Sequence, residues 1–255
     1  MNTFLRLLQT DLALWGKNII SKSVDVIIWG MIVCLVNVYI MPAFGTSSFF
    51  ILIQAVGLIV GANGAEIFGQ VFRMVSDFEN EKYISYELTL PVSSWIIFMR
   101  LITLYTINGL FLCVLMLPVL KLVMGGLLPL TPLCVLWVVL ALIPINAFFA
   151  TFTLLLVGFV SSVARCGSIM TRVLFPLWFL GGFSFSYKIA HSIAQNYAYL
   201  MLLSPYTYAT EMLRAIILGS DQFISIEICL FVLITLTLLF GMIGIMRIKK
   251  RLDYV

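Results

Sequence analysis

The sequence predicts an all-α membrane protein with six transmembrane helices. Of its 255 residues, 62% are hydrophobic and only 10% are charged, whereas a soluble domain contains roughly 45–50% apolar and about 25% charged residues. So few charges cannot cover the surface of a soluble fold of this size. The composition excludes a soluble enzyme and a disordered chain, and the formal charge of +4 is too small for a nucleic-acid-binding surface.

Two long stretches without charge give the second observation. Residues 26–65 and 122–164 contain no Asp, Glu, Lys or Arg. A transmembrane helix needs about 20 apolar residues to cross the hydrocarbon layer, so each stretch holds a loop as well as spanning segments. Because both stretches are continuously apolar and do not alternate, they indicate helices and exclude transmembrane β-strands.

The elements follow in order from this pattern. Residues 1–23 have apolar residues at helical spacing, which predicts an amphipathic connecting helix lying on the membrane surface. Asp11 interrupts the apolar face of this helix, so we expect Asp11 to face a protein partner. Charge and turn signals then place six spans in a single transmembrane domain covering residues 1–255: about 25–42, 49–70, 96–118, 133–160, 168–187 and 223–246.

The distribution of Lys and Arg predicts the orientation. With the N-terminus inside, 12 of the 15 basic residues fall on the inner side and 3 on the outer side, as the positive-inside rule requires. Both termini are therefore expected in the cytoplasm. We expect an integral, multi-pass protein of a bacterial inner membrane.

Residues 188–222 are apolar enough to suggest a seventh span. A seventh span would bury Glu211 and Arg214, and each central charge costs about 2.5–3.5 kcal/mol on insertion scales. We therefore expect an external, partly re-entrant pair of short helices, the second starting at Ser204 and Pro205 and ending at Gly219. Glu211 and Arg214 are three residues apart, so they can pair on one face of that helix.

Catalytic motifs are missing from the chain. His191 is the only histidine, the five cysteines form no C-x-x-C pair, and no phosphate-loop motif G-x-x-x-x-G-K-[ST] occurs. The cysteines are expected to be buried free thiols. We therefore expect no enzyme activity, no metal site and no cofactor on this chain.

Span two carries the most informative polar residues inside the membrane. Four of them share one helix face, Asn63, Glu66, Gln70 and Arg73, beside a face of small residues, Gly57, Gly61, Ala65 and Gly69. One interpretation is helix packing, with Glu66 paired to Arg100 or Arg165. The other is a polar patch on a transport path, including Asn63 and Glu66.

Span five contains aromatic residues on both sides of Gly181 and Gly182. One interpretation is an aromatic belt combined with core packing. The other is a hydrophobic gate, formed by Phe179 and Phe183, beside a flexible pair of glycines.

The stretch 77–91, DFENEKYISYELTLP, lies between spans two and three on the predicted cytoplasmic side. Its mixture of apolar and acidic residues predicts a short amphipathic helix. This helix is either interfacial or a docking helix for a soluble partner. The candidate contacts to such a partner are Glu79, Glu81, Tyr83, Glu87, Leu88 and Pro91.

These features together resemble the membrane permease subunit of type-2 ABC exporters over nearly the whole chain. The amphipathic helix before span one, the acidic helix ending in Pro-Val-Ser at 79–93, and the segment F-P-L-W-F-L-G-G-F-S-F-S at 175–186 match that family. The most specific match is L-S-P-Y-T-Y-A-T-E-M-L-R, which is similar to the family's N-P-x-x-Y-x-x-E-x-x-R and contains Pro205, Tyr208, Glu211 and Arg214.

Two departures accompany this resemblance. Ile84-Ser85-Tyr86-Glu87 stands where many members have Gly-Thr-Leu-Glu, and Ser204 replaces the usual Asn. Both departures weaken an assignment to a particular subfamily.

The resemblance implies a permease that pairs with a second, identical permease and with two cytoplasmic ABC ATPase subunits. ATP and Mg would be bound by the ATPases, which would dock on the helix at 77–91, and membrane lipids would surround the spans. The implied substrates are lipid-like, drug-like or glycan molecules, including polysaccharides and lipid-linked oligosaccharides. The alternatives are an ion-gradient-driven secondary transporter or channel, and a membrane-bound enzyme or assembly factor.

Overall fold

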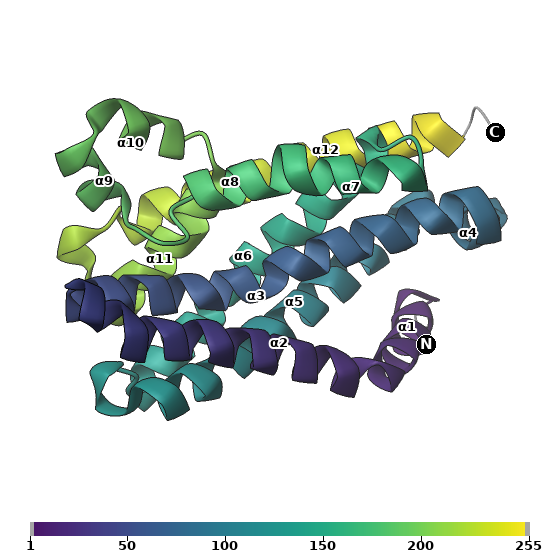
Figure 1. The fold of residues 1–255 in the computed structure, drawn as a ribbon. Helices are drawn as coiled ribbons and strands as arrows, with labels where there is room; N and C mark the ends of the chain where they lie inside the picture. Colours follow the sequence, from purple (N-terminus) through teal and green to yellow (C-terminus); the bar gives the residue numbers. More distant parts are fainter. Residues whose placement is uncertain (1–2, 253–255) are drawn as a thin grey trace.

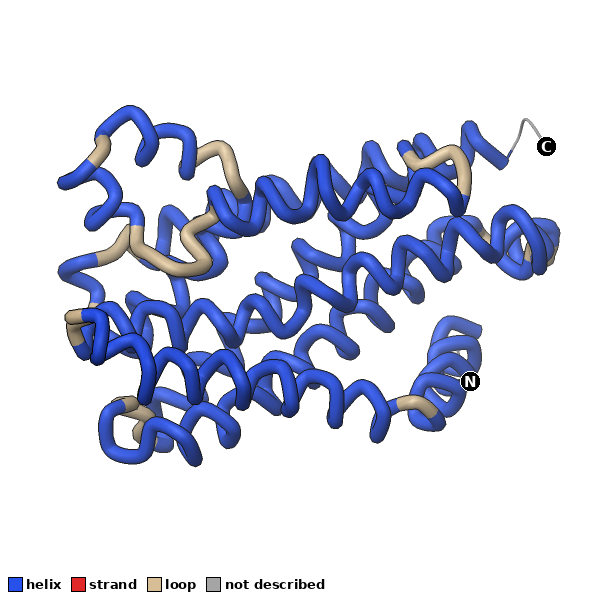
Figure 2. Tube along the Cα trace, viewed as in Figure 1, coloured by secondary structure: helices blue, strands red, loops and turns tan. Residues whose placement is uncertain are grey.

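The computed structural model describes residues 3–252, which are almost entirely helical and contain no strand (Figure 2). Six helical stretches are long and apolar enough to span a membrane, which confirms the predicted number. They are Ile19–Phe44, Ser48–Glu81, Ser94–Leu127, Pro132–Phe159, Val163–Leu180 and Ile226–Leu252. The chain is therefore an all-α, multi-pass membrane protein.

The N-terminal helix is shorter than predicted. α1 covers Thr3–Lys17 and α2 covers Ile19–Leu35, so residues 19–23 belong to span one. The chain bends at Asn18, whose N–H donates to the Trp15 carbonyl in a turn. Residues 1 and 2 of the predicted helix lie outside the described residues.

The first two spans form a helical hairpin. α2 continues through a π-helical turn, η1 (Val36–Ile40), and a 3₁₀ turn, η2 (Met41–Phe44), and ends at Gly45. α3 (Ser48–Ser76) begins where the hydroxyl of Ser47 accepts the Phe50 N–H at 3.3 Å, an N-cap contact. A π-helical turn, η3 (Asp77–Glu81), extends α3 beyond the predicted end of span two.

The remaining spans include the core of the bundle. α5 (Ser94–Met124), followed by η4 (Gly125–Leu127), and α6 (Pro132–Phe159) are spans three and four, with Pro118 and Pro144 inside them. α6 packs against α3, α5, α11 and α12 and supplies much of the buried apolar surface. α12 (Ile226–Leu252) is span six.

Span five is assembled from short pieces and is shorter than predicted. η5 (Val163–Arg165), α7 (Cys166–Ile169), η6 (Met170–Leu174) and α8 (Phe175–Leu180) form it. It ends at Leu180 and not near residue 187, because Gly182 has a φ of 68° that a right-handed helix cannot contain.

The segment between spans five and six contains three short helices, so the predicted pair was wrong. α9 (Tyr187–Ile193), α10 (Gln195–Met201) and α11 (Pro205–Leu218) follow one another. α9 starts directly after its N-cap residue Ser186, whose hydroxyl accepts the Ile189 N–H at 3.4 Å. The predicted limits of α11 are confirmed, because it starts after Ser204 and ends at Gly219.

The two ends of the bundle carry different elements (Figure 1). α4 (Tyr83–Thr89) and both ends of the described chain lie at one end, whereas α9, α10 and α11 lie toward the other. An even number of spans places both ends of the chain on the same side of the membrane. α4 is also shorter than the predicted helix over 77–91, because residues 77–81 continue α3.

Candidate functional site

α4 is separated from α3 by one residue with unusual backbone geometry. Lys82 has a φ of 55°, in the left-handed region, and is the only described non-glycine residue with positive φ. The carboxylate of Asp77 then accepts the N–H groups of Tyr83 and Ile84, both at 3.0 Å. Asp77 thereby caps the first turn of α4, where a negative charge is favourable.

The two faces of α4 have different surroundings. Ile84 and Glu87 point inward and are buried, and Leu88 packs partly against the core. Tyr83 is 49% exposed and Tyr86 is 63% exposed. α4 therefore presents two aromatic rings to its surroundings while its polar inner face is held by the protein.

Arg100 of α5 holds the inner face. Its guanidinium donates to both carboxylate oxygens of Glu87, at 2.6 and 2.5 Å, in the bidentate geometry that makes Arg–carboxylate pairs strong. Its Nε also lies 3.1 Å from Oδ2 of Asp11 on α1, as an ion pair without a well-directed hydrogen bond. We call Asp11, Glu87 and Arg100 the Arg100 clamp; it joins α1, α4 and α5.

The clamp corrects the expectation for Asp11. Asp11 lies against Arg100 of its own chain. Burial raises the pKa of Asp11 above its ordinary value, and the attraction of Arg100 opposes this change.

The other candidate docking residues are spread around α4. Glu79 lies in η3, and its carboxylate accepts the N–H of Val163 at 3.2 Å, which ties the end of α3 to the start of span five. Glu81 is exposed in η3, and Pro91 is exposed beyond α4. Tyr83, Glu87 and Leu88 are thus the predicted docking residues that α4 itself contains.

Glu66 forms neither of the predicted pairs, with Arg100 or Arg165. Its Oε1 accepts from Lys22 at 2.6 Å, from Arg73 at 2.5 Å and from Asn108 at 2.9 Å. Trp15 of α1 donates in turn to Asn108 at 2.8 Å. The prediction of an Arg100 pair failed because Arg100 lies eight residues before Asn108 on α5 and is already paired with two acids.

Two of the other polar residues on the same face of α3, Asn63 and Gln70, contact α6. Asn63 donates to the side chain of Asn146 at 2.8 Å, and Thr153 donates to Gln70 at 3.2 Å. Asn63 and Gln70 are both 2% exposed. In this conformation these residues form contacts between helices, as expected for polar groups inside a bundle.

The face of small residues on α3 meets the end of span five. A Cβ on Gly57 would overlap the carbonyl of Phe183, and Gly61 lies against the rings of Phe183 and Trp178. Gly69 has open space beside it, and the side chain of Ala65 lies outside the described residues. Among the three described glycines of this face, Gly57 and Gly61 permit a close approach and Gly69 does not.

The two aromatic residues predicted as a gate lie in different places. Phe183 packs on Trp178, with ring centroids 4.6 Å apart, whereas Phe179 is 58% exposed on the outside of span five. The structure does not bring these two rings together into one constriction.

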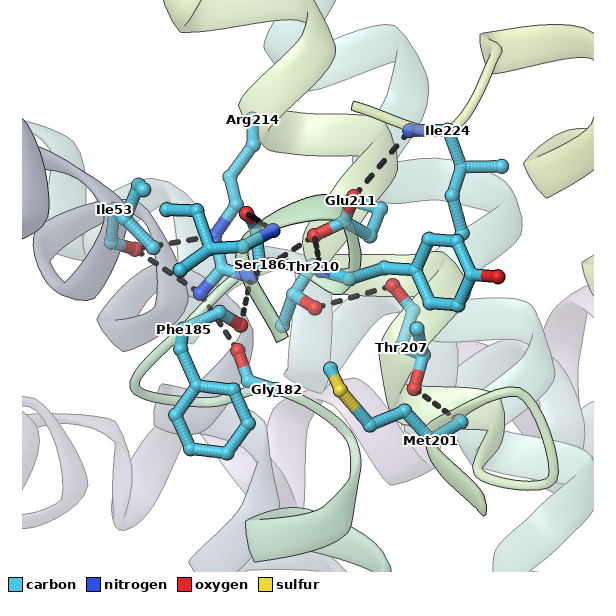
Figure 3. Close-up of polar contacts among 12 residues, drawn as sticks. Ile53, Gly182, Phe185, Ser186, Met201, Thr207, Thr210, Glu211, Arg214 and Ile224 are labelled. Atoms are coloured by element: carbon cyan, nitrogen blue, oxygen red, sulfur yellow. Dashed lines mark hydrogen bonds and ion pairs between the residues drawn. The ribbon is translucent and has the colours of Figure 1, made fainter. Parts of the chain in front are cut away.

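Arg214 and Glu211 form a second buried cluster, shown in Figure 3. The guanidinium of Arg214 donates to the carbonyls of Ile53, Gly182, Phe183 and Phe185 at 2.7–3.1 Å, and to Glu211 at 3.3 Å. Glu211 also accepts the N–H groups of Tyr187 and Ile224, at 3.1 and 3.3 Å. The ion pair between Arg214 and Glu211 confirms the predicted pairing, and both side chains are fully buried.

This second cluster, the Arg214 lock, connects α11 with the segment between spans five and six and with α3. Burial lowers the pKa of Arg214 to about 10, which still leaves the side chain positively charged at neutral pH. Burial raises the pKa of Glu211, while Arg214 and the two N–H donors act in the opposite direction. Pro205 begins α11, and the hydroxyl of Tyr208 donates to the Leu202 carbonyl at 2.9 Å.

A pocket of about 320 Å³ lies between α2, α3, span five and α11. Its lining is mainly aromatic and apolar and includes Trp29, Gly61, Leu174, Phe175, Trp178 and Tyr206. Asp25 supplies the one charged side chain among the described lining residues. The sequence did not predict this pocket, because Asp25 stands out there only as the last charged residue before the charge-free stretch 26–65.

Arg100, Asp11 and Lys22 are further residues whose roles the sequence did not predict. A charged residue inside a predicted span was the available signal for Arg100 and its need for partners. In the described residues, no group of three or more His, Cys, Asp or Glu side chains is arranged to hold a metal ion. All five cysteines are free thiols.

No family model matches the chain, and no curated protein is significantly similar to it.

Proposed function

We propose that the chain is the permease subunit of an ATP-driven ABC exporter that moves a lipid-like, drug-like or glycan substrate outward across the membrane. The observation that carries this proposal is α4, a short helix between spans two and three. It lies at the same end of the bundle as both chain ends and presents Tyr83 and Tyr86 outward. A soluble motor that docks at this end would meet α4 directly.

The Arg100 clamp supports the coupling part of the proposal. Glu87 on the inner face of α4 is held by two short hydrogen bonds to α5, and Asp11 connects the same guanidinium to α1. A displacement of α4 would therefore be transmitted to span three and to the helix that precedes span one. Packed helices joined by such contacts move as units.

The aromatic pocket supports a cargo with an apolar part. Lipids, many drugs and the lipid portion of lipid-linked oligosaccharides share this property, and apolar pockets with few polar groups are typical ligand sites. The pocket lies between spans one, two and five, beside the close contact of Gly57 and Gly61 with span five. Relative movement of these spans would change its access.

The proposed assembly contains two copies of this permease and two cytoplasmic ATPase subunits that bind ATP and Mg. Both chain ends and α4 then face the cytoplasm, α1 lies along the inner surface of a bacterial inner membrane, and α9, α10 and α11 face outward. The absence of a phosphate loop in the sequence agrees with fuel binding on another chain.

Purification from the native membrane tests the proposal. The wild-type chain is expected to copurify with an ATPase that contains a phosphate loop. Replacing Tyr83 and Tyr86 by alanine should weaken this association by about tenfold or more, because exposed aromatic residues often dominate protein interfaces. A matched control replaces Tyr39 and Tyr199, which are 69% and 52% exposed near the other end, and should leave the association unchanged.

A transport measurement separates the alternatives. Proteoliposomes that contain the permease and its ATPase should export substrate only when ATP is present. Flux driven by an ion gradient in the absence of any ATPase would overturn the proposal and favour a secondary transporter or channel.

A further inference from the structure

Four cations near the end of α6 have no acidic partner within residues 3–252. Arg165, Arg172, Arg247 and Lys250, here called the basic band, are all exposed, and none forms an ion pair among the described residues. They border two hollows of about 370 and 300 Å³ that share Phe159 in their walls. The concentration of unpaired charge beside two hollows indicates a site for an anion.

A neighbouring arginine, Arg251, has a structural role that the basic band does not share. Arg251 donates to the carbonyls of Val157, Val160 and Ser161, and so satisfies the C-terminal end of α6. Arg165, by contrast, donates only to the hydroxyl of Ser161, at 2.9 Å. Because Arg251 already closes the helix end, the basic band is not needed for that purpose.

The position of the basic band along the spans points to a lipid. Arg172 lies nine residues beyond the start of span five at Val163, which corresponds to about 13 Å along a helix. Arg172 is therefore on the side of the span, where a soluble protein docking at the end of the bundle does not reach. The long side chain of an arginine on the side of a span can extend along it, so that the guanidinium reaches the headgroups while the stem stays in the apolar layer.

The walls of the hollows combine charge with apolar surface. Phe159 is 58% exposed, and the guanidinium of Arg247 lies 4.8 Å from the centre of its ring. Ile169 and Val173 line the same hollow as Arg165 and Arg172. A ligand that fits needs a negative headgroup attached to an apolar chain. The nearby acid Glu79 is engaged with the N–H of Val163.

We propose that the basic band binds the phosphate headgroup of an anionic phospholipid, whose acyl chains lie against Phe159 and the outer side of spans five and six. This site is independent of the proposed transport function. It requires only that the chain spans a bilayer and that its basic band faces an anionic leaflet.

Competition between lipids tests the proposal on the full-length chain. The purified protein is placed in nanodiscs or mixed micelles containing phosphatidylcholine and phosphatidylglycerol, and retained lipids are counted by native mass spectrometry. The wild type should retain phosphatidylglycerol preferentially. The double variant Arg165→Gln/Arg172→Gln should lose about 25-fold in this preference, because each of these two charges would contact the bound headgroup and contribute about a fivefold factor.

Two further variants distinguish position from charge and from misfolding. Arg6→Gln/Lys17→Gln removes two exposed cations from α1 at the same end of the bundle and should leave the preference intact. Arg165→Lys/Arg172→Lys keeps the charge and should retain most of the preference.

Inorganic phosphate added at matched ionic strength identifies the source of the anion. If phosphate displaces phosphatidylglycerol completely, the site recognises free phosphate and the lipid proposal is overturned. Equal retention of both lipids by the wild type, or an equal loss in the α1 control, also overturns it.

Discussion

The protein buries one arginine toward each end of its helical bundle, and the two are held in different ways. Arg214 donates to four backbone carbonyls and to Glu211, which lies three residues away on the same helix. Arg100 instead pairs with two carboxylates, Glu87 and Asp11, from two separate helices. The Arg214 lock therefore fixes the segment between spans five and six, whereas the Arg100 clamp holds three separate helices together.

Replacement of Arg214 should produce the largest effect. Arg214→Met leaves Glu211 buried without its charged partner and leaves several carbonyls without a donor, which should lower the free energy of unfolding by about 3–5 kcal/mol. Unfolding of the purified protein in mild detergent by added denaturant measures this loss. The exposed Arg172→Met is the control, and a similar stability for both variants would show that Arg214 does not lock the segment between spans five and six.

Removal of Glu87 should have a large but more local effect. Glu87→Ala leaves Arg100 buried with only the poorly directed contact to Asp11, and breaking a buried pair in this way costs about 3 kcal/mol. Because α4 has only seven residues, we expect it to detach before the bundle unfolds. Hydrogen exchange of the amides in α4 should accelerate strongly while exchange in α6 changes little.

The exposed Glu81 provides the matched control for that measurement. Glu81→Ala removes a carboxylate from the preceding turn, and its side chain forms no ion pair among the described residues. Exchange in α4 should stay at the wild-type rate in this variant. Equal acceleration in both variants would mean that Glu87 does not anchor the helix.

The polar network around Glu66 gives an intermediate prediction. A double-mutant cycle of Lys22→Met and Glu66→Gln should yield a coupling energy of about 1 kcal/mol, because the two side chains are in contact. The same cycle with Arg100→Met in place of Lys22→Met should yield a coupling near zero. A strong coupling between Glu66 and Arg100 would contradict the arrangement of the two clusters.

The sequence predicted the six spans because their signal is physical and local. A run of about 20 apolar residues can avoid water only inside a membrane or a core, and the start and end of α11 follow from Pro205 and Gly219 in the same local way. The pairing of Glu211 with Arg214 was equally accessible, because residues three apart in a helix are neighbours.

The contacts between helices could not be predicted in the same way. Glu66 and Arg100 are both charged residues near the same end of the bundle, so pairing them was reasonable from composition. Glu66 pairs with Lys22, and Arg100 pairs with Glu87, because of the way in which the spans are rotated against one another. The interruption of the helix at Lys82 could not be predicted for a related reason. A lysine gives no turn signal, and Asp77 acts as a cap only once α4 has folded back.

The smallest expected effect concerns Asp11 of the Arg100 clamp, and it depends on pH. Burial raises the pKa of Asp11 in the folded protein above its ordinary value of 3.8, so the folded state binds this proton more tightly than the unfolded state does. Stability contributed by the protonated form is therefore present at acidic pH and is lost as the pH rises through the range above 3.8. Asp11→Asn cannot lose a proton, so its stability relative to the wild type should increase between acidic and neutral pH. Thermal unfolding of both proteins across this range measures the difference, and a change of the opposite sign would mean that the attraction of Arg100 outweighs burial and that Asp11 holds α1 as firmly as Glu87 holds α4.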